Sequence, residues 1–158
     1  DIRILDAELV RNGFHARKSA VGKRYIYQLD LAEKPDVFTR RYTYHFPQQL
    51  DLEAMRKAAK LLTGTYEFAG YTDKKDEKST KRTIYAIMIC GQGSKVSIQY
   101  EGTGFLYHMV RILTGTLLEV GTGARSIESV KEPLKSKDRS QAGFLAPARG
   151  LFLDEVYY

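Results

Sequence analysis

Alternating apolar and polar positions predict strands near both ends of the chain. Residues 23–31 alternate most clearly, because tyrosine or leucine occupies every odd position from 25 to 31 and forms one face of an extended segment. A looser alternation over residues 2–10, and a similar one over residues 150–158, predict two further strands. We also expect a short extended piece at residues 42–46.

A β-hairpin is predicted in the middle of the chain. Residues 82–90 and 95–100 flank the sequence Gly-Gln-Gly-Ser, and glycines between two β-prone runs are typical of a tight turn. In the second strand Val96, Ile98 and Tyr100 alternate with polar residues, so we expect these three side chains to face the core.

Three helices are predicted between these strands. Residues 52–62 follow Asp51 as a candidate N-cap and precede Gly64, so both helix ends carry their usual signals. Residues 105–120 are apolar on most sides, which is typical of a buried helix, and residues 127–135 predict a shorter one. This order indicates an α+β fold, in which a mostly antiparallel sheet carries its helices on one face.

The length and composition fit a single domain spanning residues 1–158. With 43% hydrophobic and 28% charged residues, the composition argues against a disordered or fibrous chain. No apolar run is long enough to cross a bilayer, and no secretory signal pattern is present. A single cysteine, Cys90, excludes a disulfide within the chain. We therefore expect a cytoplasmic protein with no membrane partner.

The residues favour no metal site and no complete set of catalytic groups. The three histidines and the cysteine lack metal-ligand spacing, and no glycine-rich phosphate loop links a strand to a helix. No serine or cysteine lies in a nucleophile elbow. Asp73 and Asp76 lie in a lysine-rich loop, where solvated surface charge is the simpler interpretation.

Positive charge is concentrated near the N-terminus. The chain has 25 lysine and arginine residues against 19 aspartate and glutamate residues, which gives a net charge of +6. Five basic residues and no acidic one fall between Arg11 and Arg24. This basic strip is either a solvated surface loop or a contact surface for the phosphates of a polyanion, and the sequence leaves both open.

Arg111 is the least expected residue of the predicted buried helix. An unpaired charge is costly inside a protein, so buried arginines normally have partners. The residues three and four positions away carry no acidic group. They are Tyr107, His108, Thr114 and Gly115. Arg111 therefore either reaches water or backbone carbonyls, or lines a pocket and orients a carboxylate or phosphate. His108 is either a second ligand-facing group or a histidine satisfied within the fold.

Six segments, in order along nearly the whole chain, resemble the TruA-type tRNA pseudouridine synthases. They are Phe14-His15-Ala16-Arg17, Gly22-Lys23-Arg24-Tyr25-Ile26-Tyr27, residues 78–84, Gly102-Thr103-Gly104-Phe105-Leu106-Tyr107-His108-Met109-Val110-Arg111, residues 115–121 and Ala146-Pro147-Ala148-Arg149-Gly150-Leu151. The segment that ends at Arg111 is the strongest match. The resemblance implies a pseudouridine-synthase-like C-terminal domain.

The resemblance also implies an activity. These enzymes isomerise uridine to pseudouridine in the anticodon stem-loop region of tRNA, as homodimers and without a metal or organic cofactor. The target base is flipped out of its stack, and an aspartate acts as the nucleophile. In the family that aspartate lies in an Arg-Thr-Asp-x-Gly motif of the N-terminal half, which does not occur here; Thr72-Asp73 lacks the arginine and the glycine. The resemblance therefore implies the C-terminal part of a longer enzyme, inactive alone, in keeping with the aspartate at position 1.

Individual residues receive roles from the same resemblance. Arg111 matches the motif arginine that pairs with the nucleophilic aspartate, and Tyr25 matches the residue that stacks on the target base. Two RNA-contacting stretches and the adjoining basic strip are expected to bind tRNA. Their residues are Phe14, His15, Ala16, Arg17, Lys18, Lys23, Arg24, Lys74, Lys75 and Lys78. Lys18 departs from the aromatic residue often found at its position.

Two other functions remain open on the residues alone. A stand-alone RNA-binding module without catalysis would use the basic strip but not Arg111. A scaffold that only dimerises would use neither. Salt-sensitive tRNA binding separates the scaffold from the other two, because phosphate contacts weaken steeply as salt rises.

Overall fold

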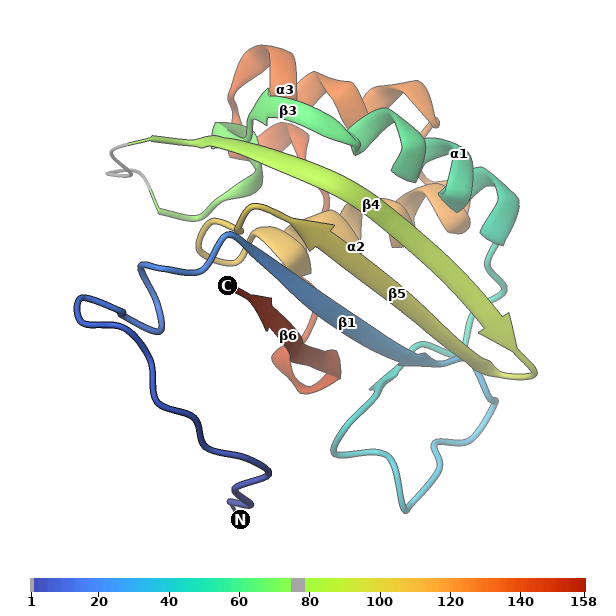
Figure 1. The fold of residues 1–158 in the computed structure, drawn as a ribbon. Helices are drawn as coiled ribbons and strands as arrows, with labels where there is room; N and C mark the ends of the chain where they lie inside the picture. Colours follow the sequence, from blue (N-terminus) through green and yellow to red (C-terminus); the bar gives the residue numbers. More distant parts are fainter. Residues whose placement is uncertain (1, 75–78) are drawn as a thin grey trace.

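Six strands form one sheet in the computed structural model, which describes residues 2–74 and 79–158. The strands are β1 (Gly22–Asp30), β2 (Tyr44–His45), β3 (Gly64–Glu67), β4 (Lys81–Gln92), β5 (Lys95–Gly102) and β6 (Leu151–Tyr157). The α-helices are α1 (Leu52–Leu62), α2 (Met109–Gly121) and α3 (Glu132–Ser136). All three helices lie on one face of the sheet (Figure 1).

The sheet is mostly antiparallel, as the sequence predicts. Its strands follow the order β2-β1-β5-β4-β3, and β6 pairs with β1 along the edge that β2 also uses. The β1–β2 pair is parallel, whereas β1–β5, β1–β6, β3–β4 and β4–β5 are antiparallel. The α+β class and the predicted hairpin between β4 and β5 are therefore confirmed. Within the described ranges, no helix is both long enough and apolar enough to pass through a bilayer.

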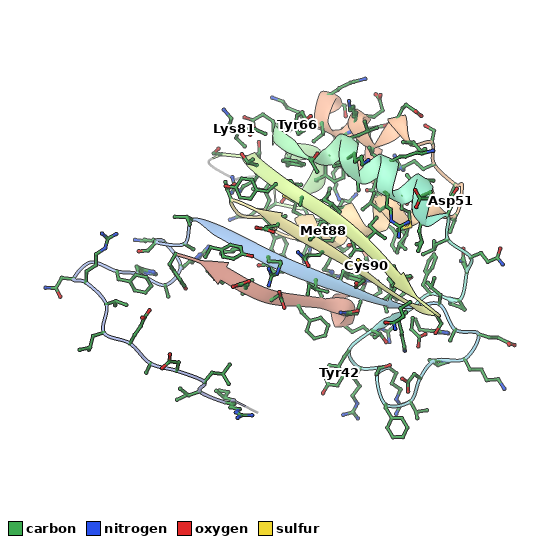
Figure 2. All side chains as sticks on the ribbon, turned by 45° about the vertical axis from the view of Figure 1, so that its right-hand side comes forward. Tyr42, Asp51, Tyr66, Lys81, Met88 and Cys90 are labelled. Atoms are coloured by element: carbon green, nitrogen blue, oxygen red, sulfur yellow. The ribbon has the colours of Figure 1, made fainter. Side chains whose placement is uncertain are left out.

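The core lies between the sheet and the helices α1 and α2. Val96, Ile98 and Tyr100 are buried on β5, as the alternation predicts. Asp51 caps α1 by accepting a hydrogen bond from the amide of Ala54 at 2.9 Å, and it lies where the helix begins (Figure 2). The helix spans Leu52–Leu62 as predicted, so the local signals were sufficient to place both its ends.

The prediction of a strand over residues 2–10 is wrong. The segment forms no ladder with any described strand, and its apolar side chains are exposed. Figure 2 shows these side chains extending away from the rest of the fold. A strand needs a neighbour to satisfy its backbone groups and to cover one face. The alternation is present in the sequence, but no described element pairs with it.

Two helices differ from their predicted bounds for local reasons. The predicted helix over residues 105–120 begins only at Met109, because His108 has a φ of 62°, in the left-handed region that a right-handed helix excludes. The predicted helix over residues 127–135 is divided into a 3-10 turn, η2 (Glu128–Lys131), and α3. Pro133 lies in the first turn of α3, where its missing N–H costs nothing.

Candidate active site

A cavity of about 230 Å³ opens between β1, the first turn of α2 and the start of β6. It is lined by Tyr25, Phe105, Leu106, His108, Met109, Val110, Arg111, Ala148 and Leu151. The fold thus brings Tyr25 and Arg111, the two residues with predicted substrate and catalytic roles, to the wall of one cavity. None of these lining residues carries a carboxylate.

Arg111 contacts the backbone but no carboxylate. Its Nε donates to the carbonyl oxygen of Ala146 at 2.6 Å, and the Ala146 amide donates back to the carbonyl oxygen of Arg111 at 3.2 Å. Within residues 2–74 and 79–158, its terminal guanidinium nitrogens have neither a hydrogen-bond acceptor nor an acidic partner. The cation at the cavity wall is therefore held in place by one edge, and its other edge is available to an anion.

Two tyrosines on the same face of β1 have different surroundings. Tyr27 is fully buried, and its hydroxyl donates to the carbonyl oxygen of Pro147 at 2.6 Å. Tyr25 is half-buried at the cavity and packs edge-to-face against Phe105, with ring centroids 5.3 Å apart. Burial raises the pKa of the Tyr25 hydroxyl, so this side chain stays neutral at physiological pH. Tyr27 is a core residue, whereas Tyr25 presents its ring to the cavity.

The predicted RNA-contacting stretch at residues 14–18 forms an exposed turn. The His15 Nδ1 accepts hydrogen bonds from the amides of Arg17 and Lys18, at 3.2 and 3.4 Å. The turn is held to the C-terminal segment by Tyr158, which packs against the Phe14 ring at 5.0 Å and donates its hydroxyl to the carbonyl of Ala16 at 2.9 Å. The side chains of Arg17 and Lys18 are exposed.

The basic residues between Arg11 and Arg24 differ in their surroundings, because some are exposed and one is paired with acidic side chains. Lys23 and Arg24 lie on β1, and Arg24 forms ion pairs with Asp154 and Glu155 of β6, both at 2.6 Å. Arg24 also donates to the Tyr157 hydroxyl at 3.0 Å. Because β6 supplies two carboxylates, the charge of Arg24 is largely compensated within the fold, unlike the charges of the exposed turn.

The second predicted RNA-contacting stretch is described only in part. The side chain of Lys74 is exposed, and its amide donates to the Thr72 hydroxyl at 3.2 Å. Lys75 and Lys78 lie outside the described residues. The candidate contacts of this stretch remain predictions.

Sequence reasoning missed a cluster that joins Asp73 to the cavity. Its carboxylate accepts from His108 Nδ1 at 2.7 Å and from Arg139 Nε at 2.8 Å. Asp73 is exposed, as expected of a surface charge, but the structure adds two partners that the sequence did not reveal. Burial alone would raise the pKa of Asp73, but the hydrogen bonds from His108 and Arg139 outweigh it and lower that pKa.

No metal centre is formed by the described side chains. Among residues 2–74 and 79–158, no three histidine, cysteine or acidic side chains are gathered closely enough to hold a metal ion. Cys90 is exposed and unpaired on β4 (Figure 2).

Comparison with known proteins decides the family. The sequence profile of a family described as tRNA pseudouridine synthase matches residues 58–158, more than half of the chain. The chain belongs to the tRNA pseudouridine synthase family. Similar proteins include tRNA pseudouridine synthase A of Bacillus subtilis, 46% identical, of Geobacillus sp. (strain WCH70), 45% identical, and of Clostridium kluyveri, 41% identical.

Each of these synthases is longer than this chain. The alignments cover 100% of the chain but 64%, 64% and 65% of the relatives. The resemblance expected from the sequence is therefore confirmed at the level of the family. The match to the synthase profile includes Asp73, His108 and Arg111, whereas Tyr25 and the turn at residues 14–18 precede its first residue.

Proposed function

We propose that this chain completes the active site of an isomerase that converts uridine to pseudouridine in the anticodon stem-loop region of tRNA. One observation carries the proposal, namely that Arg111, with its outer edge unpaired among the described residues, and Tyr25 line the same cavity in a member of this family. Arg111 pairs with the nucleophilic aspartate supplied by another part of the enzyme. Tyr25 stacks on the flipped target base.

The charge of Arg111 explains what such a pair contributes. A cation within a few ångströms of a carboxylate favours its ionised form and so keeps the nucleophile active at neutral pH. A guanidinium also binds a carboxylate through two parallel hydrogen bonds, which fixes its orientation. The bond from Nε to Ala146 leaves the outer edge of Arg111 free for this purpose. The isomerisation breaks the bond between the ribose C1′ and N1 of the base and forms one between C1′ and C5, while C5 loses a proton and N1 gains one. Composition and oxidation level are unchanged overall, so no redox group is required.

The tRNA is bound by the exposed cations. Arg17 and Lys18 lie on a turn that is fixed to the fold, and such cations position a nucleic acid through its phosphates. We assign further tRNA contacts to Lys23 and Lys74, and to Lys75 and Lys78, which lie outside the described residues, whereas the ion pairs of Arg24 favour a supporting role for it. The complete enzyme is a cytoplasmic homodimer in this proposal.

Charge reversal at the turn is expected to weaken tRNA binding. In the double variant Arg17→Glu, Lys18→Glu, we expect a roughly tenfold or greater loss of affinity at low salt. The slope of log affinity against log salt should fall by about one for each phosphate contact removed. Titration of a labelled tRNA transcript at several salt concentrations measures both effects. Lys57→Glu, on the exposed side of α1, is the matched control, and we expect wild-type binding from it.

Unchanged affinity and salt slope in the double variant would remove the turn from the RNA-contacting surface. Binding by the wild-type chain that does not depend on salt would instead favour a scaffold. The first result comes from titration of the double variant and the second from titration of the wild-type chain, so they can be told apart.

The chain alone is expected to form no pseudouridine. None of the described residues that line the cavity carries a carboxylate, so no nucleophile faces Arg111. The measurement is pseudouridine content in a tRNA transcript after incubation with the purified chain, with a full-length relative as the positive control. Turnover by the chain would show that it holds its own nucleophile. Binding without turnover by an enzyme that joins this chain to the nucleophile motif would favour the stand-alone RNA-binding module.

A further inference from the structure

His108 has an unusual backbone conformation at the edge of the cavity. Its φ of 62° lies in the left-handed region, which is unfavourable for a residue with a side chain. The position directly precedes α2, yet the side chain makes no capping hydrogen bond to that helix. Capping therefore does not account for the strain. The conformation instead places a ring that lines the cavity and is only 23% exposed.

Neighbouring groups fix this ring on several sides. Tyr107 stacks on it with a centroid distance of 3.7 Å. The Thr72 hydroxyl donates to the carbonyl oxygen of Tyr107 at 2.9 Å, so the turn itself is anchored. Asp73 binds the Nδ1 atom at 2.7 Å, and Arg139 holds the other oxygen of that carboxylate at 2.8 Å while it donates to the Gly143 carbonyl at 2.9 Å.

The Asp73 contact determines which ring nitrogen of His108 carries hydrogen. An ionised carboxylate can only accept hydrogen bonds, so the Nδ1 atom must be the donor. In the neutral ring the Nε2 atom then has a free lone pair. Within residues 2–74 and 79–158, no donor contacts that atom. In its neutral form, His108 therefore supplies a hydrogen-bond acceptor among the residues that line the cavity with Arg111 and Tyr25.

We propose that His108 contacts the substrate, its Nε2 atom accepting a hydrogen bond from a donor of the uridine bound in the cavity, and that Asp73 is the positioning residue that fixes its tautomer. The inference rests on the proposed function. Uridine offers two donors of suitable chemistry, the N3–H of the base and the 2′-hydroxyl of the ribose. Arg111 and His108 then have separate tasks, the first toward the nucleophile and the second toward the nucleoside.

Nitrogen-15 NMR of the imidazole tests the tautomer without RNA. We expect the wild-type chain to show His108 protonated at Nδ1 with a free Nε2. In Asp73→Asn the amide can donate to Nδ1 and favour the opposite tautomer. A wild-type spectrum with Nε2 protonated in a neutral ring would overturn the proposal, whatever the variants do.

Binding of modified RNAs tests the contact itself. We compare anticodon stem-loop RNAs with uridine, N3-methyluridine or 2′-deoxyuridine at the target position, against wild type, His108→Phe and His108→Gln. His108→Phe is expected to lower the affinity for the uridine RNA about tenfold, which corresponds to the loss of one hydrogen bond. The same substitution should not change the affinity for the modified RNA that lacks the donor contacted by Nε2. The RNA whose affinity is unaffected therefore identifies that donor. His108→Gln keeps an acceptor and should restore part of the affinity.

The outcomes separate this inference from the proposed function. If His108→Phe lowered the affinity for all three RNAs equally, His108 would have a structural role and the proposed contact would be overturned. Equal binding of the uridine RNA by wild type and both variants would also overturn it. If the wild-type chain binds none of the RNAs, the proposed function fails, and the inference fails with it. The tautomer spectrum decides the matter if His108→Phe does not fold.

Discussion

Replacing Arg111 by glutamine is expected to lower turnover of the complete enzyme by roughly a hundred- to a thousandfold, which is typical for removal of one preorganised charge-stabilising group. Glutamine keeps a donor for the carbonyl oxygen of Ala146 but has no charge to hold a carboxylate ionised. Turnover of Arg111→Lys should lie between that of wild type and that of Arg111→Gln, because lysine keeps the charge but lacks the planar guanidinium fork. The measurement is the rate of pseudouridine formation in a tRNA transcript, alongside tRNA affinity, which should stay near wild type.

Arg56 supplies a matched control for this substitution. Like Arg111, it lies on a helix and donates from Nε to a backbone carbonyl, that of Ile89 at 3.0 Å. Unlike Arg111, it is paired with a carboxylate, Glu53, and lies away from the cavity. Arg56→Gln should leave turnover within about twofold of wild type. If Arg111→Gln also left turnover unchanged, the outer edge of its guanidinium would have no catalytic partner, and the proposed role of Arg111 would be lost.

Elements with strong local signals were predictable from the sequence. α1 has a capping aspartate, strong helix formers and a terminal glycine, and these act within a few residues of one another. The hairpin between β4 and β5 is similarly local. By contrast, the alternation over residues 2–10 is a local pattern whose outcome depends on a distant partner, since strand pairing satisfies the backbone groups. Local reasoning could not reveal that no described strand supplies this pairing.

The candidate site was predictable in its residue types but not in its contacts. The sequence marked Arg111 because no acidic residue lies one helical turn away. It could not show that Nε contacts the carbonyl oxygen of Ala146, because that contact depends on how the segment before β6 packs along α2. The Asp73–His108 pair escaped for the same reason. Its members are far apart in the chain, and no spacing rule links a loop carboxylate to a residue before a helix.

The packing of the segment before β6 along α2 leads to a strong prediction about stability. A Cβ atom built on Gly115 would lie 1.9 Å from the carbonyl oxygen of Phe144 and 2.8 Å from its carbonyl carbon. A Cβ atom on Gly143 would lie 2.5 Å from the amide nitrogen of Thr116. Two backbones are therefore in direct contact here, and the same segment continues to Ala146, which binds Arg111.

Gly115→Ala is expected to lower the free energy of unfolding by about 2–4 kcal/mol, because a backbone carbonyl cannot move aside as a flexible side chain can. Alanine in an unobstructed helix would instead stabilise by about 0.5–1 kcal/mol, so the sign of the effect is diagnostic. Urea unfolding followed by circular dichroism measures it. Gly104→Ala, which meets no atom within 4 Å, should change the free energy of unfolding by less than about 1 kcal/mol. A neutral or stabilising Gly115→Ala would mean that the segment can withdraw from α2, and the Ala146 contact would then be too loose to orient Arg111.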